Sequence, residues 1–216
     1  MLNRATQKTS TLPSALPQFS HIKRYVDKTD GTDGVAKILP GEYYVTQSNE
    51  MITTVLGSCI AVCAYDLKLK IGGMNHFMLP LDSQSGSINS ADVTKCTRYG
   101  NYAMELMIND ILTLGGRRSK LEFKVFGGAK LMKHGSNIGA QNIHFVRSFL
   151  ENEGYSISSS DVGITYPRKV KFFPETGKAK VRRLPSSDVE EIIHQEENLN
   201  TQSEPTLDDH GDLELF

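Results

Sequence analysis

Hydrophobic and polar positions alternate along most of this chain in short runs, and two longer stretches repeat with helical periodicity. One helix is expected to start at Ser90 or Asp92 and to end at Gly115-Gly116, and a second to span residues 138–152. Strands outnumber helices and come in consecutive groups, which predicts an α/β fold with mixed or antiparallel sheets. The expected strands lie at residues 41–46, 51–56, 59–65, 71–78, 121–126, 155–162, 168–173 and 178–183.

The runs 59–65 and 71–78 are joined by a short polar connector, which predicts an antiparallel hairpin. With the turn centred near Lys68, Cys59 would lie opposite Phe77 and one step from His76, and such cross-strand neighbours have Cβ atoms about 4.5–5.5 Å apart. The hairpin would therefore bring a thiol close to an imidazole.

A thiol beside an imidazole is a candidate nucleophile with its base. A neighbouring imidazolium lowers the pKa of a cysteine below its usual value of about 8.5, so we expect an ion pair of Cys59 and His76. The Gly57-Ser58 step suits a tight turn that could aim backbone N–H groups at an oxyanion. Thr53, six residues before Cys59, could orient the ring as a third group.

Each of these residues also has a purely structural interpretation. Cysteine is among the most buried residue types, and a single Cys in an apolar strand usually serves packing. A single His is likewise usually structural, and threonine is common in strands because of its shape. Residue types and spacing alone leave both interpretations open.

Two longer segments resemble a known family. The motif Thr53-Val55-Leu56-Gly57-Ser58-Cys59, followed by Gly72-Gly73-Met74-Asn75-His76-Phe77-Met78-Leu79-Pro80, is similar to the chemoreceptor glutamine deamidases of bacterial chemotaxis, the CheD family. The resemblance continues through Arg98-Tyr99-Gly100, Ala103-Met104-Glu105, Phe126-Gly127-Gly128-Ala129, Ile138-Gly139 and Pro174-Glu175-Thr176-Gly177, and covers about residues 20–184.

The resemblance implies a catalytic triad of Cys59, His76 and Thr53, and a three-layer α/β/β sandwich with mixed sheets. It implies no cofactor. The segment 161–168 departs from the family, which usually carries a Gly-Gly pair and then Gly-Arg there. We therefore regard the conformation of this loop as open.

The implied reaction is the hydrolysis of glutamine side chains to glutamates, through a thioester on Cys59, in the cytoplasmic helices of methyl-accepting chemoreceptors. The alternative is a non-catalytic binding partner of a CheC-type chemotaxis phosphatase, a contact that the resemblance also implies. An intact set of Cys59, His76 and Thr53 favours the enzyme, because a binding role needs no nucleophile. A cysteine protease is less favoured, because no Cys-Trp step or similar context is present.

Length and cysteine content fit one cytoplasmic domain. The chain has 216 residues, of which 38% are hydrophobic, enough for one sizeable core. Residues 1–20 lack an apolar stretch and read as a flexible segment, neither signal peptide nor membrane span. Three cysteines do not form a disulfide framework, and Cys59 and Cys63 stand about 13 Å apart on one strand, too far for a disulfide or for two zinc ligands.

Charge divides the chain into a basic body and an acidic tail. Residues 185–216 hold ten acidic residues and no Lys or Arg, which leaves residues 1–184 with 24 basic against 15 acidic residues. We expect residues 21–184 to form the catalytic domain and residues 185–216 a solvated, disordered tail. A sharper hypothesis is that the tail folds back on the body and competes with an acidic substrate. The basic residues are scattered and follow no nucleic-acid-binding motif, so nucleic acid is not an expected partner.

Overall fold

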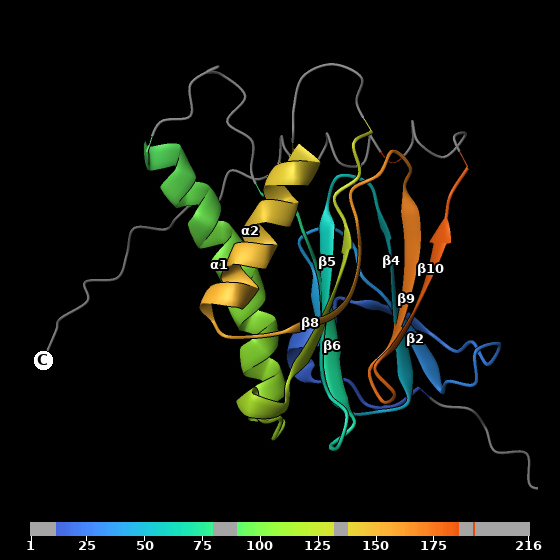
Figure 1. Ribbon diagram of the computed structural model, residues 1–216. Coiled ribbons are helices and arrows are strands. Elements are labelled where there is room, and N and C mark those ends of the chain that lie inside the picture. Colours follow the sequence, from blue (N-terminus) through green and yellow to red (C-terminus); the bar gives the residue numbers. More distant parts are fainter. Residues whose placement is uncertain (1–11, 80–89, 132–137, 186–191, 193–216) are drawn as a thin grey trace, which may run out of the picture.

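The computed structural model describes residues 12–79, 90–131, 138–185 and 192, with side chains in the first helix from residue 98 onward. Two five-stranded sheets pack face to face, and two helices cover the outer face of one of them (Figure 1). The protein is therefore a three-layer α/β/β sandwich with mixed sheets, as expected. The tail beyond residue 185, apart from Ile192, lies outside the described residues.

The sheet beside the helices, sheet B, has the strand order β3-β6-β5-β7-β8. Its strands are Tyr43–Thr46 (β3), Ile60–Asp66 (β5), Ile71–Phe77 (β6), Glu122–Gly127 (β7) and Ile157–Val162 (β8). β7 and β8 are parallel, and the other neighbours are antiparallel. Every residue of β5 and β6 is buried, because helices lie on one face of these strands and the second sheet on the other.

The outer sheet, sheet A, has the order β1-β2-β4-β9-β10. Its strands are Lys23–Tyr25 (β1), Gly34–Lys37 (β2), Glu50–Leu56 (β4), Arg168–Phe173 (β9) and Lys178–Arg183 (β10). β2 and β4 are parallel and the rest antiparallel. Because one face of β9 and β10 meets solvent, buried and half-buried residues alternate along β9, and exposed and half-buried residues alternate along most of β10.

The two helices are Ser90–Thr113 (α1) and Ile138–Asn152 (α2). The expected end of α1 is confirmed: the N–H groups of Gly115 and Gly116 bond the carbonyls of Leu112 and Ile111, and Gly115 has φ +98°. The expected side-chain cap of α1 lies outside the described side chains. No described helix is long and apolar enough to cross a membrane.

The register of the β5–β6 hairpin differs by one residue from the prediction. Ile60, not Cys59, lies opposite Phe77, and Ala61 pairs with His76. The turn contains four residues, 67–70, and its centre lies between Lys68 and Leu69. The Asp66 carboxylate fixes it by accepting hydrogen bonds from the N–H groups of Lys68 and Leu69.

Candidate active site

The connection from β4 to β5 carries Gly57, Ser58 and Cys59 from one sheet to the other. Three neighbours hold the carbonyl groups of this connection. Ala129 N–H bonds Gly57 O at 2.8 Å, Gly128 N–H bonds Cys59 O at 2.7 Å, and the Asn142 side-chain amide donates to Ser58 O at 2.9 Å. The peptide planes before and after Cys59 are thus fixed.

The glycine turn at the end of β7 packs directly against the Cys59 segment. A Cβ on Gly127 would lie 2.1 Å from Cys59 O, and Gly127 and Gly128 have φ +110° and +66°. Both the space and the backbone conformation therefore require glycine here. The turn supports the Cys59 segment directly.

Asn142 of α2 is a supporting residue that the sequence did not single out. It is fully buried, and its Oδ1 accepts the N–H of Leu79 at 2.9 Å while its amide donates to Ser58 O. It thereby ties the Cys59 segment to the chain that leaves β6. In sequence it is a polar residue on the apolar face of a predicted helix, which is the one signal that could have marked it.

His76 lies buried on β6, with 2% of its surface exposed. Its backbone is held by residues before β3, since His76 O accepts the N–H of Gly41 at 2.7 Å and His76 N–H donates to Glu42 O at 2.9 Å. Its ring nitrogen Nδ1 lies 2.8 Å from the hydroxyl of Thr54, which also donates to Ile38 O at 2.8 Å. The ring is thus oriented from sheet A, across the interface between the sheets.

These contacts select one tautomer of His76. The Thr54 hydroxyl has one hydrogen and Ile38 O can only accept, so both bonds are made together when Nδ1–H donates to Thr54. The lone pair then resides on Nε2, which is buried without a hydrogen-bond partner among the described residues. His76 thus presents a proton acceptor in the interior.

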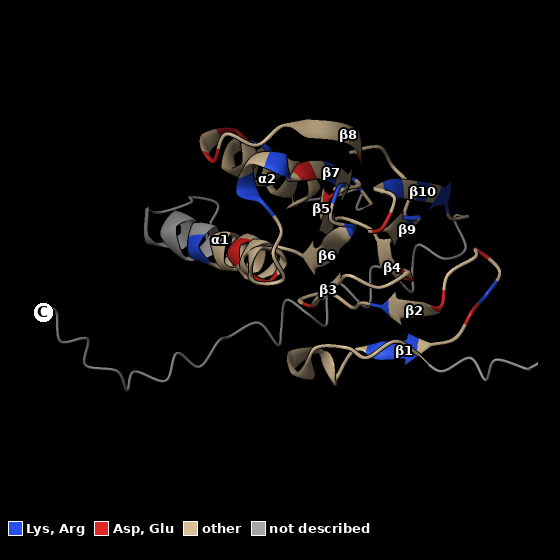
Figure 2. Cartoon of the chain, turned by 90° about the horizontal axis from the view of Figure 1, so that it is seen from below, with Lys and Arg blue, Asp and Glu red and all other residues tan. Residues whose placement is uncertain are grey.

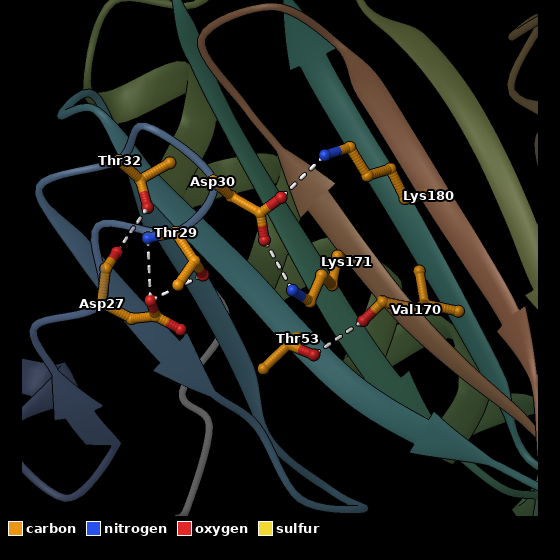
Figure 3. Close-up of polar contacts among 8 residues, drawn as sticks. All are labelled: Asp27, Thr29, Asp30, Thr32, Thr53, Val170, Lys171 and Lys180. Carbon is orange, nitrogen blue, oxygen red and sulfur yellow. Dashed lines mark hydrogen bonds and ion pairs between the residues drawn. The ribbon is translucent and has the colours of Figure 1, made fainter.

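The threonine beside the imidazole is Thr54, not the predicted Thr53. Successive side chains of a strand point to opposite faces, so only one of the two can face His76. Thr53 points to the outer face of sheet A and donates to Val170 O at 2.9 Å (Figure 3). The contact to Nδ1 in this structure is therefore made by Thr54, and the catalytic role expected for Thr53 stays a prediction.

Burial determines the charge of His76. Desolvation lowers its pKa from 6.5 to about 3, so the ring is neutral at neutral pH. The expected ion pair with Cys59 is therefore not the favoured resting form. A neutral ring with a free Nε2 lone pair is suited to remove a proton from a thiol.

Cys59 is fully buried and lies two residues before Ala61, the cross-strand partner of His76. Cys59 itself lies in the bend just before β5, which begins at Ile60, so the chain brings it to the end of β5 whose residues pair with Phe77 and His76. In the predicted register the two would have faced opposite sides. Burial raises the pKa of Cys63, which lies on β5, well above its usual value, which fits a packing role.

Tyr99 of α1 lies near Gly41 and within electrostatic reach of Cys59. A Cβ on Gly41, whose N–H binds His76 O, would lie 3.9 Å from the Tyr99 hydroxyl oxygen. Burial raises the pKa of Tyr99, and the negative charge of a Cys59 thiolate raises it further. A phenolic hydroxyl therefore stands near the thiol and keeps its proton at neutral pH.

The loop between β8 and β9, where the sequence departs from the family pattern, lies against the same turn. Gly163 N–H donates to Gly127 O at 2.9 Å, and Lys130 N–H donates to Ile164 O at 2.8 Å. The buried Arg168 guanidinium binds Asp161 and Gly163 O. Ile164 has φ +70°, a strained conformation for a β-branched residue and one that glycine adopts readily.

No group of three or more potential metal ligands occurs among the described residues. His76 uses Nδ1 in the contact with Thr54, and the described contacts leave Nε2 for the chemistry. The arrangement thus combines a thiol, a neutral base and an oriented backbone. These are the parts needed for nucleophilic attack on an acyl carbon.

The chain is similar to proteins of one family. The family model described as CheD chemotactic sensory transduction matches residues 78–183. The probable chemoreceptor glutamine deamidase CheD of Hahella chejuensis is 45% identical over 215 residues, covering 100% of both chains. The probable chemoreceptor glutamine deamidase CheD 1 of Shewanella oneidensis is 47% identical over 206 residues, 94% of this chain and 98% of that protein. On this similarity, which extends over the whole length, the chain belongs to the CheD family.

Proposed function

We propose that this protein is a cytoplasmic protein-glutamine deamidase of bacterial chemotaxis, with Cys59 as its nucleophile. The names of its relatives, probable chemoreceptor glutamine deamidases, support the deamidase activity and the receptor substrate. The observation that carries the chemistry is the 2.8 Å contact between His76 Nδ1 and the Thr54 hydroxyl, which leaves the buried Nε2 as the proton acceptor we infer.

The first step of the proposed reaction is attack on the glutamine carboxamide carbon. His76 Nε2 removes the Cys59 thiol proton as sulfur bonds to that carbon, and the carbonyl oxygen becomes an oxyanion. Backbone N–H groups of the fixed Cys59 segment would stabilise this charge. Because the negative charge forming beside the ring favours imidazolium, the pKa of His76 rises as the proton arrives.

The second half releases ammonia and then glutamate. Imidazolium gives its proton to the leaving nitrogen as the carbon–nitrogen bond breaks, which leaves a thioester on Cys59 and a neutral His76. His76 then removes a proton from water, the oxygen bonds to the thioester carbon, and the sulfur leaves with the proton. The product glutamate carries one more negative charge than the glutamine. Throughout, Thr54 keeps the ring in place, a positioning role.

Access to the thiol requires a local rearrangement. Cys59 is fully buried, so a glutamine side chain reaches sulfur only after neighbouring residues move. A glutamine at an exposed position of a receptor helix has the length and mobility to enter such a site. We therefore expect flanking receptor residues to contribute to recognition.

Mass spectrometry of a receptor cytoplasmic domain, after incubation with this protein, tests the proposal. Conversion of glutamines to glutamates is expected with the unaltered protein and with Cys63→Ala, but not with Cys59→Ala. The Cys63 variant is the matched control because both sulfurs are buried on β5 or next to it. Absence of conversion across several receptors, with the protein folded, would contradict the deamidase and favour the CheC-type binding role.

A further inference from the structure

Most of the charged side chains on the outer face of sheet A are positive. Along one row across all five strands, Lys23 pairs with Lys37, Lys37 with Thr53, Thr53 with Lys171, and Lys171 with Lys180. In a neighbouring row on this face, Lys169 lies between Val55 and Arg182. Adjacent strands are about 4.8 Å apart, so these cations repel one another across the sheet.

One carboxylate neutralises part of this positive charge. Asp30, from the loop after β1, binds Lys171 at 2.5 Å and Lys180 at 2.7 Å (Figure 3). Among the described residues, no ion pair engages Lys23, Lys37 or Lys169, which line an open hollow of about 440 Å³ on this face together with Thr53. The face thus presents a surplus of positive charge, and it lies on the side of the sandwich away from the helices (Figure 2).

We infer that this basic face binds the acidic segment 186–216 of the same chain. The segment brings ten carboxylates and no Lys or Arg, and three of these, Asp188, Glu190 and Glu191, come within eight residues of the end of β10. Its 31 residues could extend about 100 Å, whereas the five strands span only about 20 Å. Charge and length therefore both suit the face.

The place where the segment leaves the body favours this partner over a separate acidic protein. β10 is one of the two edge strands of sheet A and carries Lys178, Lys180 and Arg182 on the basic face. The chain is held at the end of β10 by the bond from Leu184 N–H to Pro167 O, 2.9 Å long. The acidic segment thus begins beside the cations it would neutralise, at a high effective concentration.

The same end of the sheet adjoins the candidate active site. Arg183 pairs with Arg168 and Arg168 with Leu56, the residue before the Gly57–Cys59 segment. Two strand spacings of about 4.8 Å place Arg183, three residues before the acidic segment, about 10 Å from Leu56. A tail bound on the basic face would, on the proposed function, repel an acidic receptor helix from the site.

Carbodiimide cross-linking of the full chain, followed by peptide mass analysis, tests the binding without relying on deamidase activity. The reagent joins a carboxylate to a lysine in contact with it. We expect links within one chain from residues 188–214 to Lys23, Lys37, Lys169, Lys171 or Lys180. They should disappear at 1 M salt, where the Debye length falls to about 3 Å from about 10 Å at 0.1 M.

A pair of double variants sharpens the experiment. Lys37→Glu with Lys169→Glu should abolish links to the remaining lysines of the face. The matched control, Lys68→Glu with Lys120→Glu, makes the same charge change at exposed lysines elsewhere and should retain them. Links that reach Lys68 and Lys120 as often as the face, that join two copies of the chain, or that survive high salt would overturn the inference. If the first variant does not fold, the unaltered chain decides by its link positions and their salt dependence.

Discussion

Replacing Thr54 by valine removes the hydroxyl that orients His76 while keeping the shape of the side chain. Two buried groups then lose their partner: Nδ1–H of His76 and the carbonyl of Ile38. Leaving a buried polar group unsatisfied costs about 1–3 kcal/mol, so we expect a loss of stability of this order. The imidazole also loses the contact that keeps its proton on Nδ1 and the lone pair on Nε2.

The effect on catalysis follows from this contact. If orientation of the ring is worth about 1–2 kcal/mol in the transition state, kcat for receptor deamidation falls about 5- to 30-fold, since about 1.4 kcal/mol corresponds to a factor of ten. Thr54→Ser, which retains the hydroxyl, should recover most of the rate. The assay is initial rates by mass spectrometry on a receptor cytoplasmic domain, with folding checked by urea denaturation.

Thr53→Val provides the matched control on the adjacent residue. It removes a hydroxyl that donates to Val170 O on the other face of β4, away from the ring. Its kcat should stay within about twofold of the unaltered protein, since no contact to His76 is lost. A Thr53→Val variant that loses activity while a folded Thr54→Val variant keeps it would refute the assignment of Thr54.

Three further predictions concern stability and support of the site. Because the folded-state pKa of His76 lies near 3 and the unfolded value near 6.5, the unfolded chain binds the proton between these values, and stability is lost as pH falls through this window. Between pH 7 and 4 the unfolding free energy of the unaltered protein should fall about 3 kcal/mol more than that of His76→Gln. The same dependence of unfolding free energy on pH in both proteins would contradict this. Ile164→Gly should raise stability by about 0.5–1 kcal/mol in urea denaturation by relieving the positive φ, whereas Val26→Gly, at a similarly exposed residue, should lower it. Asn142→Asp keeps the acceptor for Leu79 N–H but loses the donor to Ser58 O, so it should reduce kcat more than it changes KM, and an unchanged kcat would exclude this support.

Local patterns predicted most of the elements because their signals lie within each segment. Helix 138–152 and strands 168–173 and 178–183 match α2, β9 and β10 residue for residue. The strands β1 and β2 were not predicted. Both strands are short and contain Lys or Gly. They form because each pairs with a neighbouring strand: β2 pairs with β4, and β1 pairs with β2. Such pairing depends on residues far apart in the sequence.

The sequence marked Cys59 and His76 as candidate reacting groups, which stays a prediction, but it did not mark the residues that support them. The hairpin marked Cys59 and His76 as candidates, although the predicted register would have turned them to opposite sides. Which of Thr53 and Thr54 contacts the ring depends on which face of β4 meets sheet B. The one-residue difference in register follows from a four-residue turn fixed by Asp66, whose role no alternation pattern reveals. The charge of His76 depends on its burial, which requires the packed sandwich.

Trapping the acyl intermediate tests the central claim, that Cys59 is the nucleophile, most directly. A glutamine-containing receptor fragment is mixed with excess protein and quenched in acid, where thioesters survive, and the peptides are analysed by mass. The account predicts a peptide containing Cys59 that carries the substrate less ammonia, and none in Cys59→Ala. Glutamate formed by the Cys59→Ala variant, or an adduct on another residue, would contradict it.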